Sequence, residues 1–111
     1  MIIEKPWGYE EILATNDLYV MKKIVVREGH RISLQVHRQK RETWYIINGE
    51  GAVTLGNTMF AVKPDKVVDI PTGTQHRIYA GKCDIVLIET STPQLDDIVR
   101  IEDDYGRRSI L

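Results

Sequence analysis

The stretch Ile32-Ser33-Leu34-Gln35-Val36-His37 alternates apolar and polar residues with a period of two. Successive side chains of a β-strand point to opposite faces of the sheet, so this pattern predicts a strand with one polar and one apolar face. We expect Gln35, His37 and the serine between the apolar residues to face the inside of a barrel. The apolar face should point outward, covered by the N-terminal strand or by a second subunit.

Isoleucine, valine and threonine dominate the other apolar runs, which are short and separated by glycine or proline about every 8 to 12 residues, as in an all-β sandwich or small barrel. The strands that we predict besides 32–37 are 9–13, 18–26, 43–48, 51–55, 58–62, 67–70, 76–80, 83–90 and 98–101. The pair Gly56-Asn57 tolerates the positive φ of a tight hairpin, so 51–55 should pair with 58–62.

The chain has 111 residues, of which 42% are hydrophobic and 28% charged, as expected for one globular domain over residues 1–111. This length can bury a core without disulfides or a structural metal, so any bound metal can be functional. The formal charge of -1, with scattered basic residues, argues against a nucleic-acid or membrane partner. The single cysteine, Cys83, and the lack of a leader or long apolar run predict a cytoplasmic protein.

Candidate metal ligands lie on three neighbouring predicted strands. Gln35 and His37 share one strand face, Glu42 precedes the next strand, and His76 follows the turn 70–75. Imidazole nitrogens with carboxylate and amide oxygens suit one divalent ion among Zn, Mn, Fe, Co and Ni. A histidine in a strand is more often structural, so these donors alone leave both roles open.

The spacing of these residues resembles the two sequence motifs of the cupin family. The positions that follow the first motif, with glutamine in place of its first histidine, are Gly29, Gln35, His37, Glu42 and Gly49. Those that follow the second are Pro71, Gly73 and His76, whereas Asp65-Lys66 and Ala80 depart from it. The resemblance implies an all-β cupin double-stranded β-helix, a small jelly-roll barrel, with a metal on Gln35, His37, Glu42 and His76.

A closer resemblance, to the type II mannose-6-phosphate isomerase domain, covers nearly the whole chain. The segments that carry it are Lys5-Pro6-Trp7-Gly8, Lys22-Lys23-Ile24, 33–37, Glu42-Thr43-Trp44 and the diagnostic 96–107. Many family members carry this domain behind a mannose-1-phosphate guanylyltransferase. Here we expect a standalone domain without guanylyl transfer.

The resemblance implies interconversion of mannose 6-phosphate and fructose 6-phosphate through an enediol, with the metal as electrophile. Glu89 is the candidate base. Lys40, which stands at the family's arginine position, and Arg100 are the candidate phosphate readers. Lys22, which also matches the family, Lys23 and Arg31 are further candidates. Trp7 and Trp44 can either stack on the sugar or pack in the core.

Two other functions remain open from the sequence. One is a non-catalytic or regulatory cupin that binds metal and sugar, consistent with the missing arginine. The other is a small iron-dependent oxygenase, because the same donors leave positions for O₂ at Fe(II). The expected partners are a sugar phosphate and a second copy of the chain, since small cupins that this chain resembles are commonly dimers.

Overall fold

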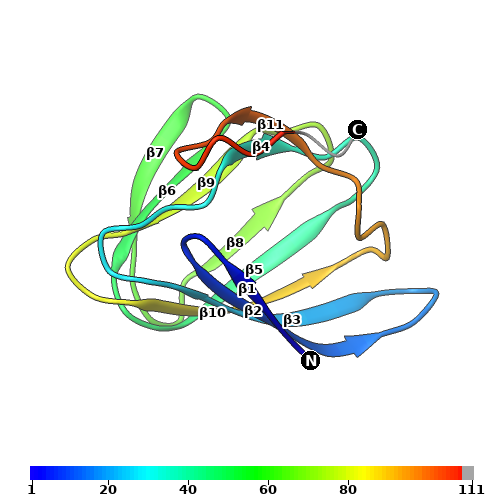
Figure 1. Ribbon diagram of the computed structural model, residues 1–111, viewed down its shortest axis with the longest axis horizontal. Coiled ribbons are helices and arrows are strands. Elements are labelled where there is room, and N and C mark those ends of the chain that lie inside the picture. The colour runs from blue at the N-terminus through cyan, green and yellow to red at the C-terminus, as the bar shows by residue number, and fades with distance from the viewer. Residues whose placement is uncertain (109–111) are drawn as a thin grey trace.

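The computed structural model describes residues 1–108, whose strands form two antiparallel sheets that face each other (Figure 1). The six-stranded sheet has the order β1-β2-β3-β10-β5-β8, and the five-stranded sheet has the order β11-β4-β9-β6-β7. The strands are β1 (Ile2–Lys5), β2 (Gly8–Thr15), β3 (Val20–Val26), β4 (Leu34–Val36), β5 (Glu42–Asn48), β6 (Gly51–Leu55), β7 (Thr58–Val62), β8 (Val67–Ile70), β9 (His76–Ala80), β10 (Ile85–Ser91) and β11 (Val99–Glu102). Within residues 1–108 there is no helix long and apolar enough to cross a membrane.

The strands predicted from periodicity are present, and the all-β barrel is confirmed. The hairpin β6–β7 has the predicted pairing, from Gly51 opposite Val62 to Leu55 opposite Thr58. One strand was not predicted: β1 pairs with β2 at the edge of the six-stranded sheet. Strand β1 has only four residues. Ile3 and Lys5 are the two that lie opposite inward-facing positions of β2. Because one of them is a lysine, β1 lacks the apolar alternation of a buried strand.

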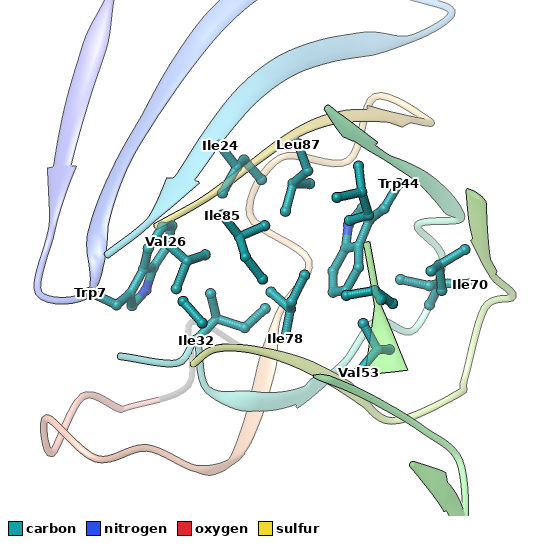
Figure 2. Close-up of a cluster of buried hydrophobic side chains, with 14 residues drawn as sticks. Trp7, Ile24, Val26, Ile32, Trp44, Val53, Ile70, Ile78, Ile85 and Leu87 are labelled. Carbon is teal, nitrogen blue, oxygen red and sulfur yellow. The ribbon is translucent and has the colours of Figure 1, made fainter. Parts of the chain in front are cut away.

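The core fills the space between the two sheets (Figure 2). Strand β10 illustrates the alternation, because Ile85 and Leu87 are fully buried whereas Val86 and Ile88 between and after them are only half-buried. The other members of the cluster come from both sheets: Trp7, Ile24, Val26, Ile32, Trp44, Ile46, Val53, Val62, Val68, Ile70, Ile78 and Ala80. Six members of this cluster, Trp7, Ile24, Ile32, Trp44, Ile78 and Leu87, also line the pocket that holds polar residues of the site described below.

The prediction that Ile32 faces outward with Leu34 and Val36 is wrong. Ile32 is buried in the core, while the other two are half-buried. The reason is that regular pairing in this stretch begins only at Leu34, and Arg31 makes an isolated bridge to Tyr79. The N-terminal strand belongs to the other sheet and does not cover this face, so cover by a second subunit stays a prediction.

Gly49 and Asp65 are two of the turn residues that take the left-handed conformation. Gly49, between β5 and β6, has φ 89°, and a Cβ there would lie 2.1 Å from the carbonyl oxygen of Asp84, so glycine is required for close approach as well as for φ. Asp65 has φ 75° where the cupin motif usually has glycine. Its carboxylate accepts a hydrogen bond from the Tyr45 hydroxyl at 2.6 Å, which stabilises the turn.

We expect Leu87→Ala to lower the free energy of unfolding by about 2–5 kcal/mol, because it opens a cavity in the closed core. Ile47→Ala is the matched control, since Ile47 lies on the outer side of neighbouring β5 and is 46% exposed. Urea denaturation followed by circular dichroism measures both. Equal losses in the two variants would contradict this assignment of the core.

Candidate metal centre

Three side chains that can bind a metal converge inside the barrel. His37 follows β4, Glu42 begins β5 and His76 begins β9, and one ligand atom from each lies within 4.8 Å of the others. Glu42 Oε1 is 3.0 Å from His76 Nε2 and 3.6 Å from His37 Nε2. All three side chains are at most 2% exposed. The structure therefore brings together three of the four predicted ligands.

Backbone carbonyls fix the orientation of both imidazole rings. His37 Nδ1 donates to the carbonyl of Asp97 at 2.5 Å, and His76 Nδ1 donates to the carbonyl of Thr74 at 2.8 Å. A ring whose Nδ1 carries the proton has its lone pair on Nε2, and both Nε2 atoms face Glu42. This is the arrangement by which proteins orient metal-binding histidines.

The carboxylate of Glu42 is buried without a hydrogen-bond donor among residues 1–108 in good geometry, as is His37 Nε2. Such atoms are costly to bury, at about 1–3 kcal/mol each and more when charged. Burial alone would raise the pKa of Glu42, but without a metal a proton on the facing Nε2 of His37 or His76, together with the charge of Lys40, outweighs burial and holds the pKa well below its usual range. A metal ion would replace such a proton, and it would then meet an anion and imidazole lone pairs at the same point.

Gln35, the fourth predicted ligand, borders this cluster. It lies opposite His76 in the pairing of β4 with β9, and its Nε2 is 3.5 Å from His76 Nε2. Its Oε1 accepts a hydrogen bond from the Ser33 hydroxyl at 2.7 Å. A rotation that exchanges the two ends of the amide would present an oxygen to the cluster, so its role as a ligand stays a prediction.

Lys40 lies in the loop between β4 and β5, with Nζ 3.4 Å from Glu42 Oε2. It is only 7% exposed. Burial by itself would lower the pKa of Lys40, but the carboxylates of Glu89 and Glu42 more than compensate and raise it. The ammonium is therefore a fixed positive charge beside the cluster.

A pocket opens beside the cluster and is lined by Gln35, His37, Lys40 and Trp44. Glu89 on β10 is buried in this pocket rather than facing solvent. Its Oε1 accepts a hydrogen bond from Trp44 Nε1 at 3.1 Å. Burial and the nearby charge of Glu42 raise the pKa of Glu89 to about 8, against the opposing effect of Lys40. Trp44 contributes to the core and to the site, because its indole also meets the His76 ring edge-on at a centroid distance of 5.6 Å.

Basic residues line the pocket around this centre, and two of them were not predicted. Lys22, on β3, is directly opposite Glu89 and is paired with Glu10 at 3.0 Å. The residues that sequence reasoning missed are Lys5, on the unpredicted strand β1, and Arg107. Arg107 belongs to the diagnostic 96–107 segment, but its distance from the cluster in sequence gave no sign that it lines the pocket.

The remaining phosphate candidates lie elsewhere. Arg100 pairs with Gln35 across β11 and β4 and so shares its inward parity, but it is not among the residues that line the pocket. Lys23 is opposite Ile88 and points to the outer face of the six-stranded sheet. Arg31 binds the carboxylate of Asp104 with both Nε and Nη2, on the outside of the five-stranded sheet.

The donor set fits a divalent metal. Two neutral imidazole nitrogens and one carboxylate oxygen are ligands that Zn and the neighbouring transition ions accept, and the orphaned Glu42 and His37 atoms would be satisfied by such an ion. Cys83, the single cysteine of the chain, is exposed and is not part of the ligand cluster. The residues that would hold the metal are His37, Glu42 and His76, with Gln35 beside them.

The two facing sheets and the inward histidines and carboxylate define a small barrel of the cupin class, and comparison with solved structures agrees. KdgF from Halomonas sp. matches with a TM-score of 0.80 at 18% identity, covering 86% of this chain and 90% of that one. An RmlC-like cupin from Shewanella frigidimarina matches with a TM-score of 0.79 at 20% identity, covering 86% of each chain. These likenesses confirm the fold.

Residues 1–103 match the family model described as Mannose-6-phosphate isomerase C-terminal, and the chain belongs to this family. Xanthan biosynthesis protein XanB of Xanthomonas campestris is 34% identical over 109 residues, which are 95% of this chain and 23% of XanB. Mannose-1-phosphate guanylyltransferase ManC of Salmonella typhimurium is 32% identical over the same shares. The chain therefore spans about a quarter of the length of these curated relatives.

We expect a His37→Ala, His76→Ala double variant to lose stoichiometric divalent metal, because it removes two of the three converging ligand atoms. Elemental analysis after loading with Zn²⁺ or Co²⁺ measures the loss. His30→Ala is the matched control, because His30 is outside the cluster. Metal retained in the double variant would contradict the site.

The fold itself should not depend on the metal. Chelation of the parent should leave its β-type circular dichroism spectrum intact, since the apolar core does not need the ion. Loss of this spectrum on chelation would contradict the prediction.

Proposed function

We propose that this domain is a metal-dependent aldose–ketose isomerase that interconverts mannose 6-phosphate and fructose 6-phosphate. The observation that carries the proposal is the position of Glu89, a buried carboxylate that lines the same pocket as His37 and Gln35 but stands outside the ligand cluster. Such an isomerisation requires one group that moves a carbon-bound proton beside another that polarises oxygen. Membership of the mannose-6-phosphate isomerase family supports this choice of sugar.

The reaction moves one proton from C2 to C1 and another between the two oxygens, without an oxidant or a net change in atoms. A divalent ion held by His37, Glu42 and His76 would polarise the carbonyl and hydroxyl oxygens. The ionised form of Glu89 takes the proton from C2 and returns it to C1, and the Trp44 indole N–H holds its carboxylate in place. Lys40 adds a fixed positive charge near the oxygens, where negative charge develops.

Glu89→Gln should lower kcat for mannose 6-phosphate by about 10²–10⁴-fold, the usual contribution of a positioned acid–base group, while metal content stays unchanged. Glu50→Gln, an exposed carboxylate, is the control. A coupled assay that detects fructose 6-phosphate measures both variants beside the metal-loaded parent. Wild-type turnover by Glu89→Gln would exclude Glu89 as the proton carrier.

The phosphate of the substrate requires cationic partners, and we propose that they lie at the pocket mouth. Lys40 lines the pocket, and Arg100 lies beside it opposite Gln35. Lys5 is a further candidate, because it lines the pocket and, within residues 1–108, makes no ion pair, whereas Arg107 is held by Asp103 at 2.7 Å.

Substitution of a phosphate reader should lower kcat/KM for mannose 6-phosphate by about ten- to a hundredfold, the effect of one charge-assisted contact, and spare metal content. The variants are Lys40→Ala, Arg100→Ala and Lys5→Ala, with exposed Lys63→Ala as the control. Unphosphorylated mannose should react far more slowly than its phosphate. Equal rates on the two sugars in the parent would overturn the phosphate requirement, and unchanged efficiency in all three variants would exclude these residues as its readers.

A second candidate is a non-catalytic or regulatory cupin that binds metal and sugar. The observation in its favour is the contact between Lys40 and Glu42, because an internal ammonium already compensates part of the carboxylate charge that a metal would use. Metal binding without turnover on any hexose or pentose phosphate would favour this reading. Oxygen consumption by iron-loaded protein would instead indicate an oxygenase. The cytoplasmic location and the homodimer stay predictions.

A further inference from the structure

The segment after β10 lies against the loop 38–41, which connects the ligand candidates His37 and Glu42. Asp97 in this segment is only 7% exposed. Its carboxylate accepts hydrogen bonds from three successive backbone N–H groups, those of Arg38 at 3.0 Å, Gln39 at 2.6 Å and Lys40 at 2.8 Å. Successive N–H groups that point to one acceptor form an anion-binding nest. The nest fixes the loop backbone between the two ligands.

The same residue also contacts a ligand directly. The backbone carbonyl of Asp97 accepts the Nδ1 proton of His37, which keeps the Nε2 lone pair directed at Glu42. Asp97 therefore holds the His37 ring through its carbonyl and the Lys40 backbone through its carboxylate. These two contacts set where the ring and the ammonium stand relative to Glu42.

We propose that Asp97 is a positioning residue that aligns His37 and Lys40 with Glu42, so that the segment after β10 controls metal affinity and the geometry of the pocket. The inference rests on the metal centre of the proposed function. It adds that a residue outside the ligand set and the pocket lining determines how well that centre binds.

A purely structural role for Asp97 is less consistent with its surroundings. It does not belong to the apolar cluster, so its removal leaves the core packed. Loop 38–41 has other anchors, since the Thr72 hydroxyl donates to the carbonyl of Gln39 at 3.1 Å and Arg41 N–H donates to Thr92 Oγ1 at 3.0 Å. Loss of the carboxylate should therefore loosen the nest without unfolding the barrel.

The test compares Asp97→Ala and Asp97→Asn with Asp96→Asn, whose carboxylate is exposed on the adjacent residue. Metal-free proteins are titrated with Zn²⁺ and Co²⁺ against a chromophoric chelator, and amide hydrogen exchange is followed at residues 38–40. Asp97→Ala should weaken metal affinity by about 10–100-fold, as loss of a residue that orients a ligand does, and accelerate exchange at these amides. Asp97→Asn keeps one acceptor oxygen and should lose less, and Asp96→Asn should match the parent.

Unchanged metal affinity in Asp97→Ala with accelerated exchange at 38–40 would overturn the proposal, because the loop would then be loose without effect on the centre. Should Asp97→Ala fail to fold, Asp97→Asn decides by the same comparison. A parent that binds metal but does not isomerise sugar phosphates would overturn the proposed function alone. A parent that binds neither ion would overturn both.

Discussion

The structure depends on one buried carboxylate. Glu42 is 1% exposed inside a barrel whose inner surface is otherwise largely apolar. An isolated ionised carboxylate in such surroundings is strongly unfavourable, so it needs compensating charge close by. Lys40 provides part of it at 3.4 Å, and the two imidazole nitrogens at 3.0 and 3.6 Å turn the remainder into a site for a cation. The loop and strand ends around Glu42 are arranged to hold these groups at those distances.

The elements that the sequence predicted correctly have a clear alternation of buried and exposed residues or follow a known spacing. The β6–β7 hairpin belongs to the first kind, and the convergence of His37, Glu42 and His76 belongs to the second. Ile32 was placed on the wrong face because alternation presumes a regular strand, and pairing there begins two residues later. Strand β1 was not predicted because one of its inward-facing residues is Lys5, which lines the pocket, and a lysine interrupts the apolar alternation of a buried strand.

The parts of the site that could not be predicted depend on contacts across the chain that carry no side-chain signature. The Nδ1 partners of both histidines are backbone carbonyls, and the partners of the Asp97 carboxylate are backbone N–H groups 57 to 59 residues earlier. Any residue type supplies these groups, so no pattern marks them. The burial of Glu89 likewise became visible only once β10 lay between β3 and β5.

The charges of the pocket bear on what it can bind. Two carboxylates, those of Glu10 and Glu89, line the pocket together with three lysines, which are Lys5, Lys22 and Lys40. The carboxylate of Glu42 lies at its inner end, 3.4 Å from Lys40 Nζ. Because burial and the charge of Glu42 raise the pKa of Glu89 to about 8, Glu89 is mostly protonated near neutral pH. With the other five groups ionised and Arg107 matched by Asp103, the protein groups alone carry about one positive charge. A divalent ion on Glu42 would raise this surplus to about three positive charges, and a phosphate monoester carries about -1.5 to -2 at neutral pH. The proposed phosphorylated substrate would therefore offset most of this charge inside a partly apolar cavity, whereas a neutral sugar would offset none of it.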